Sequence, residues 1–232
     1  PTPLYKYLKF IFRSSLIKYL IDCGHRVTAL APKEKYNNED SIQKLKSMGV
    51  IFKSYSLSRA GVNPFKDYLS YKSICFVISQ CKPDIVIAYT AKPVIYAGMA
   101  MKHFPKISFF PLITGLGYGF TEGDGVKRKL IRQLMIILYR KGLKSSESII
   151  FQNPDDKKLF YKLKIILRNM SSHIVHGSGV DLDLYPFSPL PKKPIFLMLA
   201  RLLIDKGVRE YAEAARIVKA QFPKAIFQLA GR

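Results

Sequence analysis

The chain has 232 residues, of which 48% are hydrophobic and 23% charged, which is the composition of a globular protein with one large domain or two small ones. Its longest uncharged stretch, residues 107–120, is too short to cross a bilayer and contains Pro111, which excludes a membrane span within this sequence. Lysine and arginine total 38 against 16 aspartate and glutamate, and the resulting net charge of +22 attracts nucleic acid, an anionic membrane surface or phosphorylated substrates.

Cysteine and histidine provide no sign of a disulfide framework or a metal site. Cys23, Cys75 and Cys81 are odd in number and lack CxxC spacing, which predicts reduced, buried thiols in a cytoplasmic protein. His173 and His176 flank two apolar residues of a predicted strand, where alternation points the two rings to opposite faces.

Helical and strand patterns alternate along the chain. The first helix is ended by Gly24, and the strand that follows it is stopped by Pro32. Helices are predicted over residues 8–22, 39–48, 65–81, 93–103, 126–144, 154–163 and 207–222, and strands over residues 26–31, 50–55, 84–89, 106–113, 149–152, 173–175, 195–200 and 225–230. Apolar strands separated by helices are typical of a parallel sheet covered on both faces, so the predicted fold class is α/β with a doubly wound, Rossmann-like domain.

The glycines and prolines of residues 177–193 indicate a linker between two domains. Residues 1–176 are predicted to form the first Rossmann-like domain, and residues 194–232 the first βαβ unit of a second one. A single βαβ unit of roughly 40 residues cannot bury a core of its own. Doubly wound domains usually begin on a central strand, whereas this sequence begins with a helix and without Met. We therefore expect a first strand and its glycine-bearing turn to precede these residues, and the rest of the second domain to follow them.

Two cations flank the junction of the last predicted strand and helix. Arg201 follows strand 195–200, and Lys206 precedes Gly207, where helix 207–222 begins. Ligands of open α/β sheets bind at the carboxyl ends of strands, and the amino end of a helix presents unpaired N–H groups that favour an anion. The junction predicts a diphosphate site, and the alternative interpretation is a solvated arginine and lysine at a turn.

Several segments resemble glycosyltransferases of family 4, which have the GT-B fold. The junction resembles their donor-side motif, and the interdomain crossing is similar to theirs. The glycine-rich stretch that follows strand 106–113 looks like the Thr-Gly-Leu-Gly loop of bacterial glycosyltransferases that build capsule, O-antigen and related lipid-linked glycans. The matching segments are Phe196-Leu-Met-Leu-Ala-Arg-Leu-Leu-Ile-Asp-Lys-Gly-Val-Arg-Glu-Tyr-Ala-Glu-Ala-Ala215, Phe110-Pro-Leu-Ile-Thr-Gly-Leu-Gly-Tyr-Gly-Phe120, Gly24-His-Arg-Val-Thr28, Phe151-Gln-Asn-Pro-Asp-Asp156 and Gly177-Ser-Gly-Val-Asp181. In the fourth segment, Asn153 is predicted to cap a helix that begins at Pro154.

The resemblance implies a retaining transferase that moves a sugar from a nucleotide-sugar donor, expected to be UDP-linked, to a lipid-diphosphate-linked glycan, without a metal or other cofactor. It implies that Arg201 and Lys206 bind the donor diphosphate and offset the charge of the leaving group. The glycine-rich loop, Thr114, Gly115, Leu116 and Gly117, is expected to face the acceptor, and so is Lys92 by its position after strand 84–89. The family's paired glutamates are expected beyond Arg232, so no catalytic residue is named and this stretch alone is expected to be inactive.

The predicted helix 126–144 is both basic and amphipathic. It carries Lys127, Lys129 and Arg140 among its cations, interleaved with apolar residues such as Leu130 and Leu134. Such a helix can lie on an anionic bilayer, or it can pack on the core with a solvated basic face. With a lipid-linked acceptor, the first interpretation predicts a peripheral protein on the inner face of the plasma membrane.

Two other functions fit parts of the sequence. A non-catalytic nucleic-acid-binding protein fits the net charge, but no reader motif is present and the cations are not confined to one stripe, so nucleic acid is not the expected partner. A sugar-nucleotide epimerase would keep the GT-B fold and change the chemistry.

Overall fold

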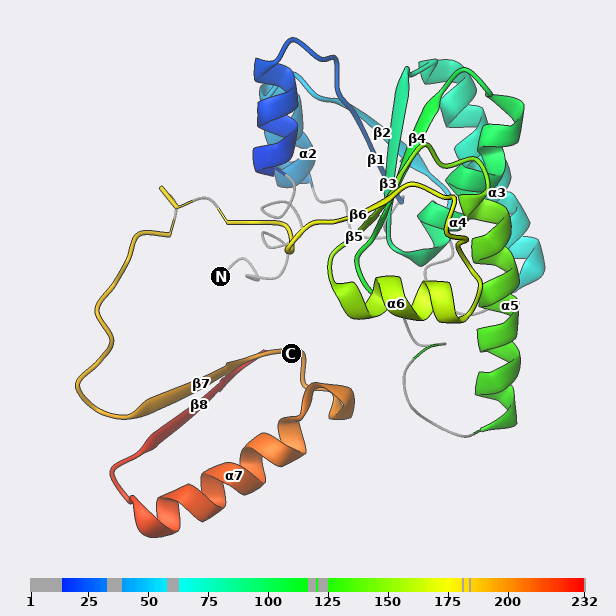
Figure 1. Cartoon of the computed structure of the whole chain (residues 1–232). Coiled ribbons are helices and arrows are strands. Elements are labelled where there is room, and N and C mark those ends of the chain that lie inside the picture. The colour runs from blue at the N-terminus through cyan, green and yellow to red at the C-terminus, as the bar shows by residue number, and fades with distance from the viewer. Residues whose placement is uncertain are drawn as a thin grey trace. The chain divides into compact units, whose positions relative to one another are not determined.

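The computed structural model describes residues 14–32, 39–57, 63–116, 120, 125–180, 182–183 and 185–231. Contacts within the chain divide it into two compact units, Pro1–Asp181 (unit 1) and Leu182–Arg232 (unit 2), which are described separately (Figure 1). The predicted linker, residues 177–193, spans this division, and the domain limits at 176 and 194 remain predictions.

Helices and strands alternate through both units, as the sequence predicts. Where the structure describes both ends of a predicted element, its bounds agree to within two residues, with the predicted helix 93–103 corresponding to α4 and the 3-10 helix η1 together. The first helix is described over residues 14–22, and residues 8–13 of that prediction lie outside the described part. Unit 1 contains β1 (Thr28–Pro32), α2 (Glu39–Ser47), β2 (Ile51–Tyr55), α3 (Pro64–Cys81), β3 (Ile85–Tyr89), α4 (Ala91–Ala100), the 3-10 helix η1 (Met101–His103), β4 (Ser108–Ile113), α5 (Val126–Leu143), β5 (Ile149–Phe151), α6 (Pro154–Lys162) and β6 (Ser172–Ile174). Unit 2 contains β7 (Ile195–Leu199), η3 (Ile204–Lys206), α7 (Val208–Gln221) and β8 (Ile226–Ala230).

Local capping explains where two helices of unit 1 begin. The Asn63 side chain accepts hydrogen bonds from the backbone N–H groups of Phe65 and Lys66, each at 3.1 Å, and Pro64 occupies the first turn of α3. The Asn153 side chain likewise accepts from the Asp156 N–H at 2.7 Å at the start of α6, which confirms the predicted cap.

All described strand pairs are parallel, as predicted. β3, β4, β5 and β6 form one sheet in that order, whereas β1 pairs with β2 and β7 pairs with β8. The prediction that Pro32 stops the first strand is wrong by one residue, because Pro32 is the last residue of β1, opposite Tyr55. Proline lacks only the N–H group, and the end of a strand tolerates that loss.

One face of the four-stranded sheet carries the core. Phe109 and Phe151 are fully buried on this face, which α4, α5 and α6 cover (Figure 1). Phe160 of α6 contacts Phe151 edge to face at 5.3 Å between ring centroids, and it contacts Tyr139 of α5 at 5.2 Å. Such aromatic pairs add specific contacts to the burial of apolar area.

The opposite face of the same sheet is less covered by the described residues. Ile85, Ile87 and Tyr89 alternate along β3 on this face, and about half of each side chain is exposed. Leu112 of β4 pairs with Tyr89 on the same face and is buried, so within the described part of the chain this face is covered at Leu112 and only half covered along β3. The reason is topological, because the helices that follow β3, β4 and β5 all pack on the other face.

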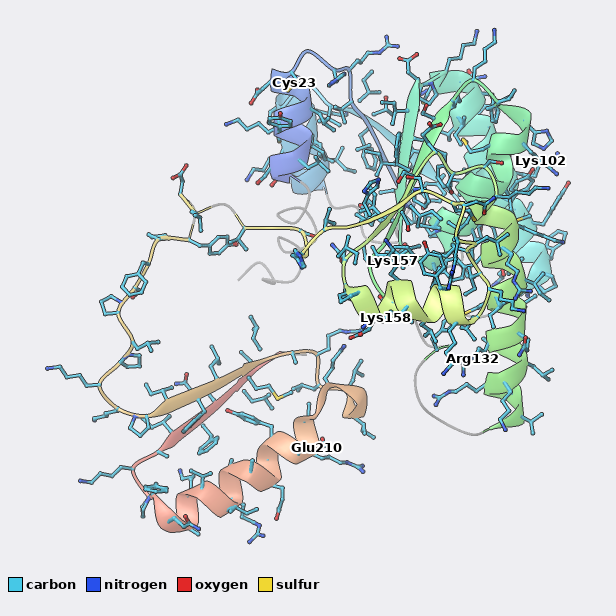
Figure 2. All side chains as sticks on the ribbon, viewed as in Figure 1. Cys23, Lys102, Arg132, Lys157, Lys158 and Glu210 are labelled. Carbon is cyan, nitrogen blue, oxygen red and sulfur yellow. The ribbon has the colours of Figure 1, made fainter. Side chains whose placement is uncertain are left out.

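The thiols differ from the prediction in their burial. All three cysteines are free, but Cys23 is exposed in the turn after the first helix (Figure 2), and Cys75 and Cys81 are half-buried. Cys75 and Cys81 both lie on α3, which presents them to the margin of the core, and helical periodicity alone could not show this. Among the described residues, no helix has the length and apolar character needed to cross a bilayer.

Candidate functional site

The two cations predicted to bind the donor lie in unit 2, at the strand-to-helix junction that the sequence predicts. Arg201 comes two residues after the end of β7, and Lys206 is the last residue of η3; both side chains are exposed. Gly207 follows with φ of 75°, which ends η3, and α7 therefore begins at Val208 rather than at Gly207 as predicted. A positive φ is outside the helical region and favours glycine. The junction therefore holds two exposed cations beside the amino end of α7, where an anion can be bound.

A close backbone contact borders this junction. A Cβ atom added to Gly231 would lie 1.7 Å from the carbonyl oxygen of Ala200, the residue that precedes Arg201. The Ala200 N–H in turn donates to the Ala230 carbonyl at 3.1 Å. The sequence analysis did not identify Gly231. A glycine directly after the last apolar strand could have indicated this close backbone contact.

The rest of unit 2 is held together by a small aromatic cluster. Phe196 of β7 stacks on Phe227 of β8 with ring centroids 4.8 Å apart. The Tyr211 ring of α7 contacts Phe227 edge to face, with ring centroids 5.8 Å apart. The Tyr211 hydroxyl lies 2.9 Å from the Phe196 carbonyl and 2.8 Å from the Gln228 carbonyl, so it ties α7 to both strands. Most other apolar side chains described in this unit are exposed, as expected of a single βαβ unit.

The residues predicted to face the acceptor lie in unit 1, at the carboxyl ends of β3 and β4. These ends are adjacent because Tyr89 of β3 pairs with Leu112 of β4. Thr114, Gly115 and Leu116 follow β4 directly, and Gly115 has a φ of 133°. Gly117 lies outside the described residues. The predicted loop therefore begins at the sheet edge where open α/β proteins bind ligands.

Thr90 occupies the same edge in an unusual backbone conformation. It links β3 to α4 with φ of 68° and ψ of 155°, and its exposed side chain makes no capping hydrogen bond. This region of φ and ψ is essentially restricted to glycine, and other residues in it are strained by roughly 1–3 kcal/mol. The sequence analysis did not identify Thr90. A polar residue directly after a predicted buried strand could have marked it as a candidate site residue.

Lys92 lies at this edge, as predicted, but it is part of an ion pair. Its Nζ atom is 2.6 Å from Oδ1 of Asp67 in the first turn of α3, and each side chain is 18% exposed. The pKa of Tyr96 is raised far above its usual range. Burial is the larger cause, and the negative charge of Asp67, with which the Tyr96 hydroxyl forms a hydrogen bond, adds to it. Asp67, Lys92 and Tyr96 together join α3 to α4 beside Thr90. Lys92 therefore has a structural partner, whatever its role toward an acceptor.

Hydrogen bonds also connect the carboxyl ends of β5 and β6. Gln152 follows β5, and its amide Nε2 donates to Ser178 Oγ at 3.1 Å in the segment after β6. The Val175 N–H donates to the Phe151 carbonyl at 2.8 Å. Thr90, the loop that begins at Thr114, and Gln152 therefore follow three neighbouring strands along one sheet edge, which provides hydroxyl and amide groups for a polar ligand. Within the described part of the chain, no cluster of His, Cys, Asp or Glu could hold a metal ion.

Comparison with known proteins places this arrangement in a family. A model described as "Glycosyl transferase 4-like" matches residues 7–153. The chain is 30% identical over 237 aligned residues to the N,N'-diacetylbacillosaminyl-diphospho-undecaprenol alpha-1,3-N-acetylgalactosaminyltransferase of Campylobacter jejuni, an alignment that covers 95% of this chain and 59% of that protein. The chain therefore spans about three fifths of the length of this relative.

Solved structures of low sequence identity share the fold. A glycosyltransferase from Rickettsia africae superposes with a TM-score of 0.61 at 16% identity, over 96% of this chain and 56% of that one. A protein assigned as a UDP-N-acetylglucosamine 2-epimerase from Listeria monocytogenes superposes with a TM-score of 0.55 at 14% identity, over 95% of this chain and 59% of that one. The fold is α/β of the GT-B type, and since a transferase and an epimerase both match it, the fold does not decide the chemistry. The family match over residues 7–153 does decide the family, and the chain belongs to the glycosyl transferase 4-like family.

Proposed function

We propose that the whole protein is a glycosyltransferase that moves a sugar from a nucleotide-sugar donor to a lipid-diphosphate-linked glycan. The observation that carries the proposal is the 30% identity, over 95% of this chain, to a transferase whose name specifies a diphospho-undecaprenol acceptor. The donor is UDP-linked, the anomeric configuration is retained, and no metal or other cofactor takes part; these finer points rest on the resemblance to family 4 glycosyltransferases. The protein acts at the inner face of the plasma membrane, where a lipid-linked acceptor is held.

Unit 2 supplies the donor side of this proposal. Arg201 and Lys206 bind the diphosphate at the start of α7, and their positive charge stabilises the negative charge that develops on the leaving group. The exposed side chains leave both cations accessible to a ligand. Unit 1 supplies the acceptor side through the sheet edge that carries Thr90, Lys92 and the loop that begins at Thr114.

The proposal is tested by transfer in the whole protein. UDP-N-acetylgalactosamine and an undecaprenyl-diphosphate-linked sugar serve as probes, and both UDP release and the lengthened lipid product are measured. We expect UDP release only when the acceptor is present. Conversion of the sugar nucleotide without acceptor would support the epimerase instead, and absence of both reactions over a panel of UDP-sugars would contradict the proposal.

The donor-side cations have a matched control in the same unit. We expect Arg201→Ala or Lys206→Ala to lower kcat by roughly 100-fold to 1,000-fold, because each removes charge from the place where the leaving group gains it. Lys219→Ala removes a cation from the last turn of α7, far from the junction, and it should leave the rate within about twofold. Equal losses in all three variants would contradict a specific role for Arg201 and Lys206.

A further inference from the structure

The outward face of α5 is apolar where a solvated helix would be polar. The buried face of α5 consists of Ile136, Tyr139, Gly142 and Leu143, which lie in its second half. On the opposite side, Val126 is 76% exposed, Leu130 67%, Leu134 42% and Ile137 48%. Their spacing of four, four and three residues places them on one face of the helix, so they form a continuous apolar stripe. This set of four residues is called the α5 stripe below.

Cations flank the α5 stripe on the same helix. The helix contains Lys127, Arg128, Lys129, Arg132, Arg140 and Lys141 and no acidic residue. Arg140 donates to the carbonyls of Leu163 and Lys164 at 2.7 and 2.8 Å, and the Arg132 guanidinium lies 5.9 Å from the centre of the Phe120 ring (Arg132 is labelled in Figure 2). Lys127, Lys129 and Lys141 are exposed and form no ion pair with any residue that the structure describes.

The position of α5 relates the stripe to the acceptor-side edge of the sheet. Because α5 connects the parallel strands β4 and β5, its amino end lies on the side of the sheet where β4 ends and the loop at Thr114 begins. The first turns of α5 extend beyond α6 in Figure 1, and no residue before Ile136 in this helix is buried. The most exposed members of the stripe, Val126 and Leu130, are therefore near the edge proposed to receive the acceptor.

We propose that the α5 stripe and its flanking lysines dock on an anionic lipid bilayer, with the apolar side chains inserted among the lipids and the lysines against their phosphate groups. This inference rests on the proposed function, since a lipid-linked acceptor is presented at a bilayer surface. Charge complementarity selects the occupant: an anionic lipid surface satisfies both the lysines and the apolar stripe. A nucleic acid would use the lysines and leave the stripe exposed to water.

A second helix of unit 1 provides the matched comparison. α3 also exposes apolar residues, among them Phe76, which is 65% exposed. However, α3 carries Lys66 and Lys72 against Asp67, and its net charge of +1 contrasts with +6 on α5. The apolar content of the two helices is comparable and their charge is not, so α3 is not expected to dock on an anionic surface.

The test is sedimentation of the full chain with vesicles, without donor or acceptor. Vesicles of equal parts phosphatidylglycerol and phosphatidylcholine are compared with vesicles of phosphatidylcholine alone. We expect binding to the first kind and little binding to the second. The double variant Leu130→Ser/Leu134→Ser should bind about tenfold more weakly. Lys127→Gln, Lys129→Gln and Lys141→Gln should each weaken binding about fivefold, and the effect should fade as salt is raised.

Matched variants make the result specific to α5. Phe76→Ser removes an equally exposed apolar residue from α3, and Lys102→Gln, Lys158→Gln and Lys162→Gln together remove exposed lysines of η1 and α6, outside α5. These variants should bind the anionic vesicles like the unchanged chain. Circular dichroism and thermal melting verify that every variant is folded, as expected for substitutions at exposed positions.

Three results would overturn the proposal. The first is equal binding, or none, to the two kinds of vesicle. The second is an equal loss of binding in Phe76→Ser and in Leu130→Ser/Leu134→Ser. The third is unimpaired vesicle binding by Leu130→Ser/Leu134→Ser combined with tight binding of duplex DNA through the α5 lysines, which would indicate a nucleic-acid partner. Transfer to a short-chain, water-soluble acceptor, measured separately in the whole protein, reports on the proposed function, so the failure of one proposal is distinguishable from the failure of the other.

Discussion

Thr90 is a single strained residue at the sheet edge that is proposed to receive the acceptor. It has a backbone conformation suited to glycine, yet a threonine is present, with its side chain exposed beside the proposed acceptor edge. Strain of this kind persists only where the surrounding structure enforces it. Here the Val94 N–H donates to the Thr90 carbonyl at 3.1 Å, and the Asp67 and Lys92 ion pair holds the start of α4 against α3.

We expect Thr90→Gly to stabilise the protein, because glycine relieves strain of roughly 1–3 kcal/mol and loses about 0.5–1 kcal/mol in conformational entropy. The net gain of about 1 kcal/mol corresponds to a rise in Tm of about 2–4 °C. Thermal melting followed by circular dichroism measures it. Thr90→Ala is the matched control, because it removes the hydroxyl and retains the strained Cβ, and its Tm should not rise. A Tm for Thr90→Gly at or below that of Thr90→Ala would show that the conformation is not strained.

At the scale of elements, the contact between α4 and α5 determines where the α5 stripe points. The two helices approach so closely that a Cβ atom added to Gly98 would lie 1.8 Å from the Gly142 carbonyl oxygen, and one added to Gly142 would lie 2.8 Å from Ile95 Cα. Backbone atoms at such distances cannot be displaced by a change of rotamer. The pair of glycines therefore holds the second half of α5 in the core while its first half projects toward solvent.

We expect Gly98→Ala to destabilise unit 1 by about 3 kcal/mol or more, since the helices must separate to admit the methyl group. The Tm should fall by roughly 6–12 °C. Gly125→Ala is the control: Gly125 precedes α5 with φ of −65°, and a Cβ atom there would meet no atom within 4 Å. Its effect should stay below about 1 kcal/mol. Similar melting temperatures for the two variants would contradict the close contact.

At the scale of the whole molecule, one half-buried and one buried tyrosine predict the response to alkaline pH. Burial, together with a hydrogen bond to Cys75, raises the pKa of Tyr71 to about 12. Burial, with a smaller contribution from the Asp156 carboxylate, raises the pKa of Tyr139 far above its usual range. Tyrosines of the unfolded chain ionise near pH 10. Since the folded state keeps its protons to higher pH, stability is constant with respect to these groups below about pH 10 and declines above it.

We expect Tyr139→Phe to reduce this decline, because phenylalanine has no proton to lose in the unfolded state. The measurement is the urea midpoint at pH 8, 10 and 11, with the change between pH 8 and pH 11 as the readout. Tyr185→Phe is the control, since Tyr185 is 49% exposed, and its decline should match that of the unchanged protein. An equally steep decline in Tyr139→Phe would show that Tyr139 does not contribute.

The sequence by itself determined the order and type of the elements, the parallel α/β class and the family resemblance. It also located Arg201 and Lys206 at a strand-to-helix junction, and Asn153 at a helix cap. These features depend on residues within one or two turns of each other, and apolar periodicity and capping groups encode them locally.

Only the tertiary structure decided which residues meet across the fold. It paired Lys92 with Asp67, placed Gly98 against Gly142, and left the α5 stripe and one face of β3 partly exposed. It also showed the strained backbone of Thr90. Such contacts join residues that are far apart in sequence, and their geometry depends on how whole helices pack against a sheet rather than on any local pattern. For the same reason, the sequence pointed to the sheet edge that is proposed to receive the acceptor, but it could not show the contacts of the residues there.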